Sequence, residues 1–232
     1  MHPHRTTAPL IGLLFLAATA TFLTSTLILD PLLKPGNDLT LLLGNQQNVV
    51  LAVWLALLDG LAILLIAAWM SPLLKPFHPA LAAGFLGFKI AELFAILLYC
   101  LSPMLLLTLA GQTSTTPPET LSALQSLLMS MRSWCLQMLY LFNGMAGVMF
   151  CVLLLKSRWI PAGLSSMGLL GYLGLPIAVV LHTTGLMDTQ QGAGMLFFVP
   201  GGLFELILPF WLFFKGFRQV KTPLQNLQGT GG

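Results

Sequence analysis

Charged side chains occur inside stretches whose composition is otherwise that of a membrane span. These residues are Asp59, Lys89, Glu92 and Glu205. Only 7% of the chain is charged, and an ionised group at mid-bilayer depth costs at least ~2.5–3.5 kcal/mol. Such groups normally face a bundle interior and find a partner there. At 1.5 Å per residue from the predicted span ends, all four lie roughly 13–18 Å deep, as does Asn143. The sequence therefore predicts a polar cluster halfway through the membrane.

Two kinds of chemistry agree with this pattern. Lys89 and Glu92 are three residues apart on one helix and are therefore neighbours on its face. Acids beside a base at this depth can bind a cation, a proton or a small polar molecule. Asp59, Glu92 and Glu205 are the candidate ligands, with Lys89 tuning them and Asn143 as a polar companion. A structural ion network that fixes helix packing explains the same residues, and both interpretations stay open.

The last apolar run contains an interruption next to Glu205. Pro200, Gly201 and Gly202 precede this acid, and Pro209 follows it. Because Pro209 has no amide hydrogen, it cannot donate to the carbonyl of Glu205. Broken helices beside acids at the midplane are where transporters bind ions and substrates. We expect these residues to form a hinge, although a proline kink satisfied by neighbouring helices is a common alternative.

The composition predicts an all-α, polytopic membrane protein. The chain has 232 residues, of which 56% are hydrophobic, and its mean hydropathy is +0.88. A helix needs about 20 apolar residues to span a bilayer. We expect one six-helix domain over residues 1–218 and a flexible cytoplasmic tail over residues 219–232. The predicted spans are 8–29, 49–70, 80–101, 134–155, 165–182 and 194–214.

The distribution of Lys and Arg predicts the orientation. With six spans both termini share one side, and that side carries most of the basic residues, whereas the opposite loops carry Lys34, with Arg132 near a helix end. The positive-inside rule then places both termini in the cytoplasm. The net charge of +3 reflects this asymmetry, and we predict no nucleic-acid partner because no basic stripe lies on a soluble surface.

The third and fourth spans are predicted to continue beyond the membrane. The third runs on past Pro103, and an amphipathic stretch leads into the fourth, starting with Thr116 as N-cap and Pro117 at the first helical position. A helix over 117–155 would be ~58 Å long, which is too long for one crossing. We expect a helical hairpin on the outer side, where it could bind a protein partner.

The Cys and His residues give no metal or cofactor pattern. The four His are scattered, and the three Cys lack metal-ligand spacing. Cys100 and Cys135 both fall near the outer ends of their helices, so a disulfide is one option there. Free thiols buried as small apolar groups are the favoured interpretation. We therefore predict no metal site and no cofactor.

Three segments resemble an uncharacterised prokaryotic membrane family, domain of unknown function 4386. Residues 84–92, Gly-Phe-Leu-Gly-Phe-Lys-Ile-Ala-Glu, are similar to its Gly-aromatic-x-Gly-x-Arg-x-x-Glu signature. Residues 156–161 resemble its inner loop before the fifth helix, and residues 204–217 resemble its closing helix. The resemblance implies six helices in a prokaryotic inner membrane and assigns no activity. Lys89 stands where the family pattern usually has Arg, which puts any bidentate pairing in doubt because an ammonium cannot fork onto two carboxyls.

Three functions follow from these observations as hypotheses. The first is an ion-coupled or proton-coupled carrier of a small molecule. The second is a non-catalytic membrane partner or sensor subunit whose charge cluster is structural. The third is an intramembrane lipid-modifying enzyme, and we favour a non-enzymatic role over it.

Overall fold

The computed structural model describes residues 3–34, 36–189 and 192–218. Over these residues the chain is helical and contains no strand, and six helices are long and apolar enough to cross a membrane. The predicted fold class is confirmed, and the predicted tail over 219–232 lies outside the described residues. The elements are α1 (Pro3–Leu32), α2 (Thr40–Gly44), α3 (Gln46–Leu74), α4 (Pro79–Ala110), α5 (Pro118–Ser157), α6 (Ala162–Thr183), the short 3₁₀ helix η1 (Gly192–Phe198) and α7 (Val199–Phe214).

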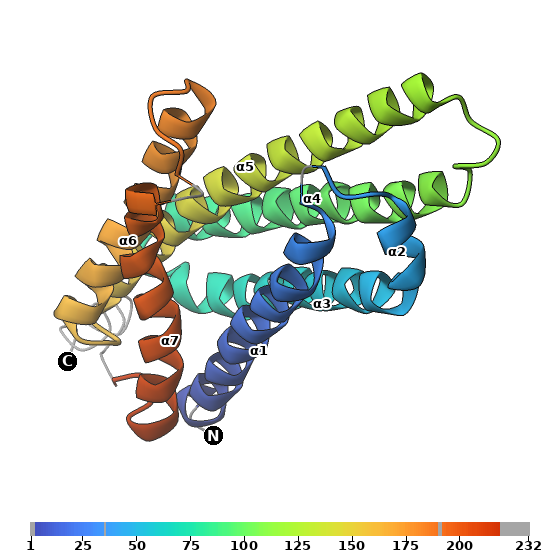
Figure 1. Cartoon of the computed structure of the whole chain (residues 1–232). Helices are drawn as coiled ribbons and strands as arrows, with labels where there is room; N and C mark the ends of the chain where they lie inside the picture. Colours follow the sequence, from blue (N-terminus) through green and yellow to red (C-terminus); the bar gives the residue numbers. More distant parts are fainter. Residues whose placement is uncertain (1–2, 35, 190–191, 219–232) are drawn as a thin grey trace, which may run out of the picture.

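The six long helices form a closed ring in sequence order. α1 packs on α3, α3 on α4, α4 on α5, α5 on α6 and α6 on α7, and α7 returns to α1 (Figure 1). Short connections favour this order, because consecutive helices then become antiparallel neighbours. In this ring, all six long helices border one common interior. Polar side chains from different spans can therefore meet without facing lipid.

The interior is packed most completely at the end that carries the two termini. One apolar cluster there takes residues from all six long helices. Phe85 stacks on Phe150 with ring centroids 5.0 Å apart, and Phe15 lies 6.1 Å from Phe150. The buried cores in the middle and at the opposite end contain residues from α1 to α5 but none from α6 or α7. The two last helices are thus less closely joined to the rest in the half away from the termini.

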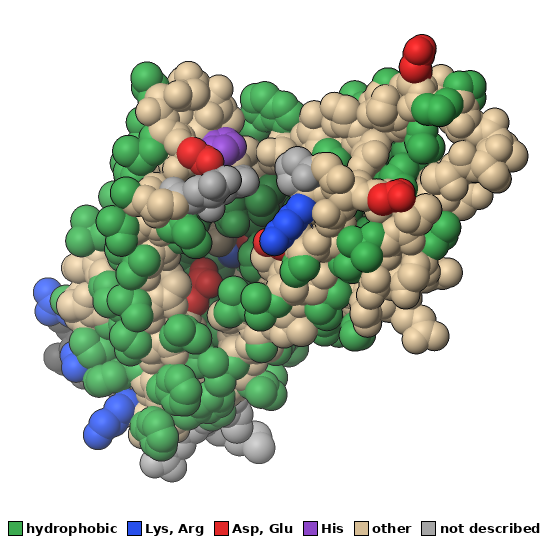
Figure 2. Space-filling view, viewed as in Figure 1, with side chains coloured by type: hydrophobic (Ala, Val, Ile, Leu, Met, Phe, Trp, Pro, Cys, Tyr) green, Lys and Arg blue, Asp and Glu red, His purple; other side chains and the backbone are tan. Residues whose placement is uncertain are grey.

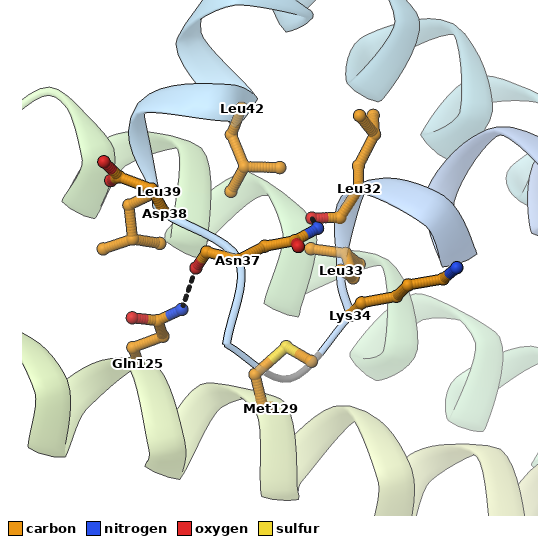
Figure 3. Close-up of a pocket in the computed structure, with 9 residues that line it drawn as sticks. All are labelled: Leu32, Leu33, Lys34, Asn37, Asp38, Leu39, Leu42, Gln125 and Met129. Carbon is orange, nitrogen blue, oxygen red and sulfur yellow. Dashed lines mark hydrogen bonds between the residues drawn. The ribbon is translucent and has the colours of Figure 1, made fainter.

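The predicted hairpin of the third and fourth spans is present. α4 and α5 extend side by side past the other helices on the side away from the termini (Figure 1). The hydroxyl of Ser102 donates a 2.7 Å hydrogen bond to the carbonyl of Leu128, which ties the two helices together. The side chain of Gln125 donates at 3.3 Å to the carbonyl of Asn37 (Figure 3), so the hairpin also contacts the loop before α2.

The predicted start of the helix that leads into the fourth span was wrong by one position. The helix begins at Pro118, and its N-cap is Pro117, which has extended backbone angles and no capping side chain. The reason is that a residue before proline is disfavoured in helical geometry. Because Pro117 precedes Pro118, it cannot be the first helical residue, and Thr116 has no helix end to cap.

The last span is broken, but at a different place from the one the proline and glycine residues predicted. The 3₁₀ helix η1 ends at Phe198 and α7 begins at Val199. Pro200, Gly201 and Gly202 therefore lie in the first turns of α7, and Pro209 lies within it. Gly201 also lies at a close contact between α6 and α7. A β-carbon added to Gly171 of α6 would lie 2.2 Å from the backbone nitrogen of Gly201.

Candidate functional site

Lys89 connects the third and fourth spans inside the ring. Its ammonium nitrogen lies 2.8 Å from Oε2 of Glu92 on the same helix. It also donates a 2.9 Å hydrogen bond to Oδ1 of Asn143 on α5. Lys89 is 9% exposed and Glu92 is 3% exposed, so both charges are removed from lipid. The spacing of three residues on α4 produced the ion pair, and the ring placed Asn143 opposite it.

Glu205 on α7 belongs to the same group of contacts. Its Oε1 accepts a 2.8 Å hydrogen bond from the hydroxyl of Tyr172 on α6. The side-chain amide of Asn143 also interacts with the Glu205 carboxyl. A continuous series of polar contacts therefore runs from Glu92 through Lys89 and Asn143 to Glu205 and ends at Tyr172. Four helices contribute to it: α4, α5, α7 and α6.

Asp59 on α3 lies beside this series without joining it by a direct contact. It is 7% exposed, and its electrostatic neighbours include Glu92, Lys89 and Glu205. Within the described residues, no ion pair or hydrogen bond connects its carboxyl to them. The cluster thus contains three carboxyl groups and one ammonium group. We use the name midplane cluster for Asp59, Lys89, Glu92, Asn143, Tyr172 and Glu205.

The midplane cluster is partly accessible from one side. Asn143 and Glu205 contact partners inside the ring, yet both keep some exposed surface. Figure 2 shows a hollow on this face of the molecule in which acidic and basic side chains are visible. The hollow agrees with the packing, because the cores in the middle and away from the termini leave out α6 and α7.

Tyr172 is a site residue that the sequence did not single out. Its ring lies against Gly147 of α5, where an added β-carbon would come within 2.1 Å of the ring. Because Gly147 on α5 has no side chain, the ring of Tyr172 on α6 fits against it. The hydroxyl of Tyr172 can then reach Glu205 on α7. Gly147 follows Asn143 by one helical turn, and this spacing was the signal that the sequence offered.

A second polar group, also missed, lies nearer the hairpin. Arg132 on α5 is 7% exposed, and its guanidinium carbon lies 3.8 Å from the centroid of the Tyr99 ring on α4. Its Nη2 donates to the hydroxyl of Tyr99 and lies 3.8 Å from Oδ1 of Asp30 on α1. The sequence placed Arg132 near a helix end, but it did not show that this residue meets Tyr99.

The cysteines and the metal-ligating side chains give a simpler result. Cys100, Cys135 and Cys151 are all free thiols, so the disulfide considered between Cys100 and Cys135 is not formed. Cys100 is buried, with its sulfur 4.0 Å from the carbonyl oxygen of Val53. Among the described residues, no three His, Cys, Asp or Glu side chains gather closely enough to hold a metal ion.

Comparison with known families gives one match that extends over nearly the whole chain. The family described as Domain of unknown function (DUF4386) matches residues 10–216. The chain belongs to the DUF4386 family. The match includes most of α1, the other five spans and every residue of the midplane cluster. No curated protein and no solved structure matches the chain.

The DUF4386 family is described as a domain of unknown function, so membership assigns no activity to the chain. The resemblance over residues 84–92 is therefore confirmed at the level of the family. The structure gives Lys89 one carboxyl partner and one amide partner. A point-like ammonium can serve both, and a forked guanidinium is not needed for this arrangement.

Proposed function

We propose that this DUF4386 protein is a proton-coupled or cation-coupled carrier of a small molecule, with the midplane cluster as its coupling site. One observation carries the proposal. Glu205 and Asn143 point into the ring at mid-bilayer depth and still keep accessible surface. A network that served only to hold helices together would gain most from complete burial and complete pairing.

The charges of the cluster support the same function. Three carboxyl groups face one ammonium group, and the ammonium is already engaged by Glu92 and Asn143. Glu205 is held by neutral donors, Tyr172 and Asn143. A carboxyl without its own cation at this depth is suited to take up a proton or a small cation from the hollow. Glu205 is therefore the proposed coupling residue, and Asp59 is the other carboxyl of the cluster that makes no ion pair within the described residues.

The packing suggests which side the cluster opens to. The half that carries the termini is filled by the cluster around Phe15, Phe85 and Phe150, while the hollow lies toward the other half. Alternating access would require this aromatic contact to open and the hollow to close. The junction between η1 and α7, immediately before Pro200 and Gly201, is the proposed hinge for that movement.

The test is proton movement by the purified protein in vesicles. A pH-sensitive dye inside the vesicles reports proton entry driven by an imposed membrane potential, with candidate solutes added outside. Glu205→Gln keeps the size and hydrogen-bonding shape of the side chain, and we expect it to abolish coupled proton entry while the protein stays monodisperse. Wild-type rates in Glu205→Gln would refute the proposal, and so would failure of both Glu205→Gln and Glu92→Gln to assemble.

A matched control distinguishes the effect of losing any acidic side chain from the effect of losing the one at position 205. Asp38 is exposed in the loop before α2, far from the ring interior. Asp38→Asn removes one acid from the surface, as Glu205→Gln removes one from the cluster. We expect Asp38→Asn to keep wild-type proton entry.

A protein-partner or sensor role is the second candidate, and the hairpin favours it. Leu124 is 40% exposed and Leu127 is 64% exposed on the extended part of α5. Apolar side chains on a projecting helix suit docking to another protein. Deleting residues 114–130 should abolish co-purification of a specific partner and leave the six-helix bundle intact. Unchanged co-purification would exclude the hairpin as the docking element.

We also propose that both termini face the cytoplasm. Exposed Lys and Arg side chains gather at the end that carries the termini (Figure 2), among them Lys75, Lys156 and Lys215. Positive loops are retained on the cytoplasmic side during insertion. A reporter that is active only in the cytoplasm, fused after residue 232, should be active. A silent fusion at full expression would reverse the orientation.

A further inference from the structure

The guanidinium of Arg132 is buried but incompletely paired. It has five N–H donors in a planar fork. Nη2 donates to Tyr99, while Nη1 has no hydrogen-bond partner among the described residues. The residue is 7% exposed, so solvent does not fully replace the missing partner. A buried donor of this kind gains strongly from an acceptor that arrives from outside.

In the described part of the chain, the only acid within ion-pair distance of Arg132 makes a long contact. Oδ1 of Asp30 lies 3.8 Å from Nη2, whereas a charge-assisted hydrogen bond measures about 2.7–2.9 Å. The Asp30 side chain is 63% exposed. Asp30 therefore balances the charge of Arg132 without satisfying its donors. It can turn away into water at little cost.

The guanidinium of Arg132 packs against the ring of Tyr99. The central carbon of the guanidinium lies 3.8 Å from the ring centroid, so the ring covers one side of the group. Nη2 is engaged by the tyrosine hydroxyl, and Nη1 is left for another acceptor. This arrangement suits a planar carboxylate or a phosphate, which accept two parallel N–H bonds. We propose that Arg132 binds the carboxylate or phosphate group of a ligand that enters the hollow, and that Asp30 is the internal anion which the ligand displaces.

The inference deepens the proposed function by naming the class of ligand. Tyr99 lies seven residues beyond Glu92 on α4, so Arg132 lies ~10 Å from the midplane cluster toward the hairpin. A ligand entering from that side would meet Arg132 before it meets the carboxyl groups. Those acids repel an anion, and protonation removes the repulsion. A small molecule with a carboxylate or phosphate group is therefore the cargo that coupling to protons would favour.

Equilibrium binding tests the site without any transport. We would titrate inorganic phosphate and, separately, acetate into the purified protein in neutral detergent at low salt, and measure heat. We expect saturable binding to the wild type and at least ~10-fold weaker binding to Arg132→Gln. Arg132→Lys should fall between them because an ammonium lacks the fork. Equal affinity of wild type and Arg132→Gln would overturn the proposal.

Asp30→Asn supplies an independent result if the Arg132 variants fold poorly. It leaves Arg132 in place and removes only the competing internal anion. We expect its affinity for phosphate to rise roughly threefold or more. Unchanged or weaker binding would show that Asp30 does not occupy the ligand position and would contradict the proposal. Lys34→Gln is the matched control, since it removes an exposed charge on the same side and should leave binding unchanged.

The anion could come from a soluble molecule or from a lipid headgroup, and the same variants distinguish the two. Phosphate binding in nanodiscs of phosphatidylcholine alone would indicate a soluble ligand. Loss of phosphate binding when phosphatidylglycerol is added, with that lipid retained on the wild type but not on Arg132→Gln, would indicate a headgroup. Either result supports an anion site at Arg132. Proton entry is measured separately with Glu205→Gln, so failure of coupling and failure of anion binding are told apart.

Discussion

The hydroxyl of Tyr172 on α6 donates a 2.8 Å hydrogen bond to the carboxyl of Glu205 on α7. Tyr172 is 3% exposed and fixes the direction in which Glu205 points. Tyr172→Phe removes the donor and keeps the ring. Because a hydrogen bond to a charged group contributes about 1.5–3 kcal/mol, we expect coupled proton entry to fall by about tenfold. The dye assay in vesicles measures this change.

The control for this prediction is Tyr140→Phe on the neighbouring helix. Tyr140 packs on Phe198 with ring centroids 4.9 Å apart, and that contact does not require its hydroxyl. Both variants remove one hydroxyl from an aromatic ring inside the bundle. A similar loss in both would mean that Tyr172 has no special relation to Glu205.

Breaking the pair of Lys89 and Glu92 should separate stability from function. Lys89→Met leaves a buried carboxyl without its cation, and removing one partner of a buried pair typically costs about 3–5 kcal/mol. We expect a clear drop in the thermal unfolding midpoint in detergent. The double variant Lys89→Met, Glu92→Leu removes both charges and should recover most of that stability. If the double variant also recovers coupled proton entry, the pair is structural only.

Lys89→Arg tests whether the residue usual in the family pattern fits this chain. A guanidinium can reach both Glu92 and Asn143, which now share one ammonium. Since both partners offer acceptor oxygens, we expect stability within about 1 kcal/mol of the wild type. The unfolding midpoint checks this, and a loss as large as that of Lys89→Met would show that the site is shaped for an ammonium group.

The sequence predicted much of the fold because hydrophobic length is a local property. Runs of about 20 apolar residues fixed six spans, and the ion pair of Lys89 and Glu92 follows from helical spacing on one element. The contact of Tyr172 with Glu205 depends on how α6 and α7 cross, and the stacking of Arg132 on Tyr99 depends on the register of α4 against α5. Both contacts arise from packing between helices, so the spacing of residues along one helix cannot predict them.

The predicted hinge residues are a second case in which packing between helices decided the outcome. Proline and glycine predicted a break at residues 200–202, whereas the helix type changes at Val199. Proline is tolerated in the first turn of a helix because its missing amide hydrogen has no partner there in any case. Pro200 can therefore begin α7 as easily as break it. The close approach of Gly171 and Gly201 decides between these outcomes, and it is a tertiary contact.

The contact between Gly147 and Tyr172 gives a test of packing beneath the site. A β-carbon at position 147 would lie 2.1 Å from the tyrosine ring, so Gly147→Ala must displace that ring. Overpacking of this kind typically costs about 1–3 kcal/mol. We expect a lower unfolding midpoint and reduced proton entry, because Tyr172 can no longer reach Glu205.

Gly87→Ala is the matched control on α4. No atom lies within 4 Å of the position that its β-carbon would take, and alanine favours the helix by about 1 kcal/mol over glycine. The midpoint should stay the same or rise slightly. Equal losses in Gly147→Ala and Gly87→Ala would mean that the contact with Tyr172 is not what limits this position.

A local pH dependence is expected in the loop before α2. The backbone amide of Thr40 donates a 3.0 Å hydrogen bond to the Asp38 carboxylate, and this bond lowers the pKa of Asp38 below its ordinary value of 3.8. A carboxyl with a lowered pKa stabilises its turn above the ordinary value and loses that contribution as the pH falls through the lowered one. Amide exchange at residues 39–44 should therefore speed up below about pH 4 beyond the intrinsic rate. Asp38→Asn should abolish this pH dependence, because its side chain does not titrate and can accept the same bond at every pH. An exchange profile in Asp38→Asn that still follows the wild type would show that another group controls the turn.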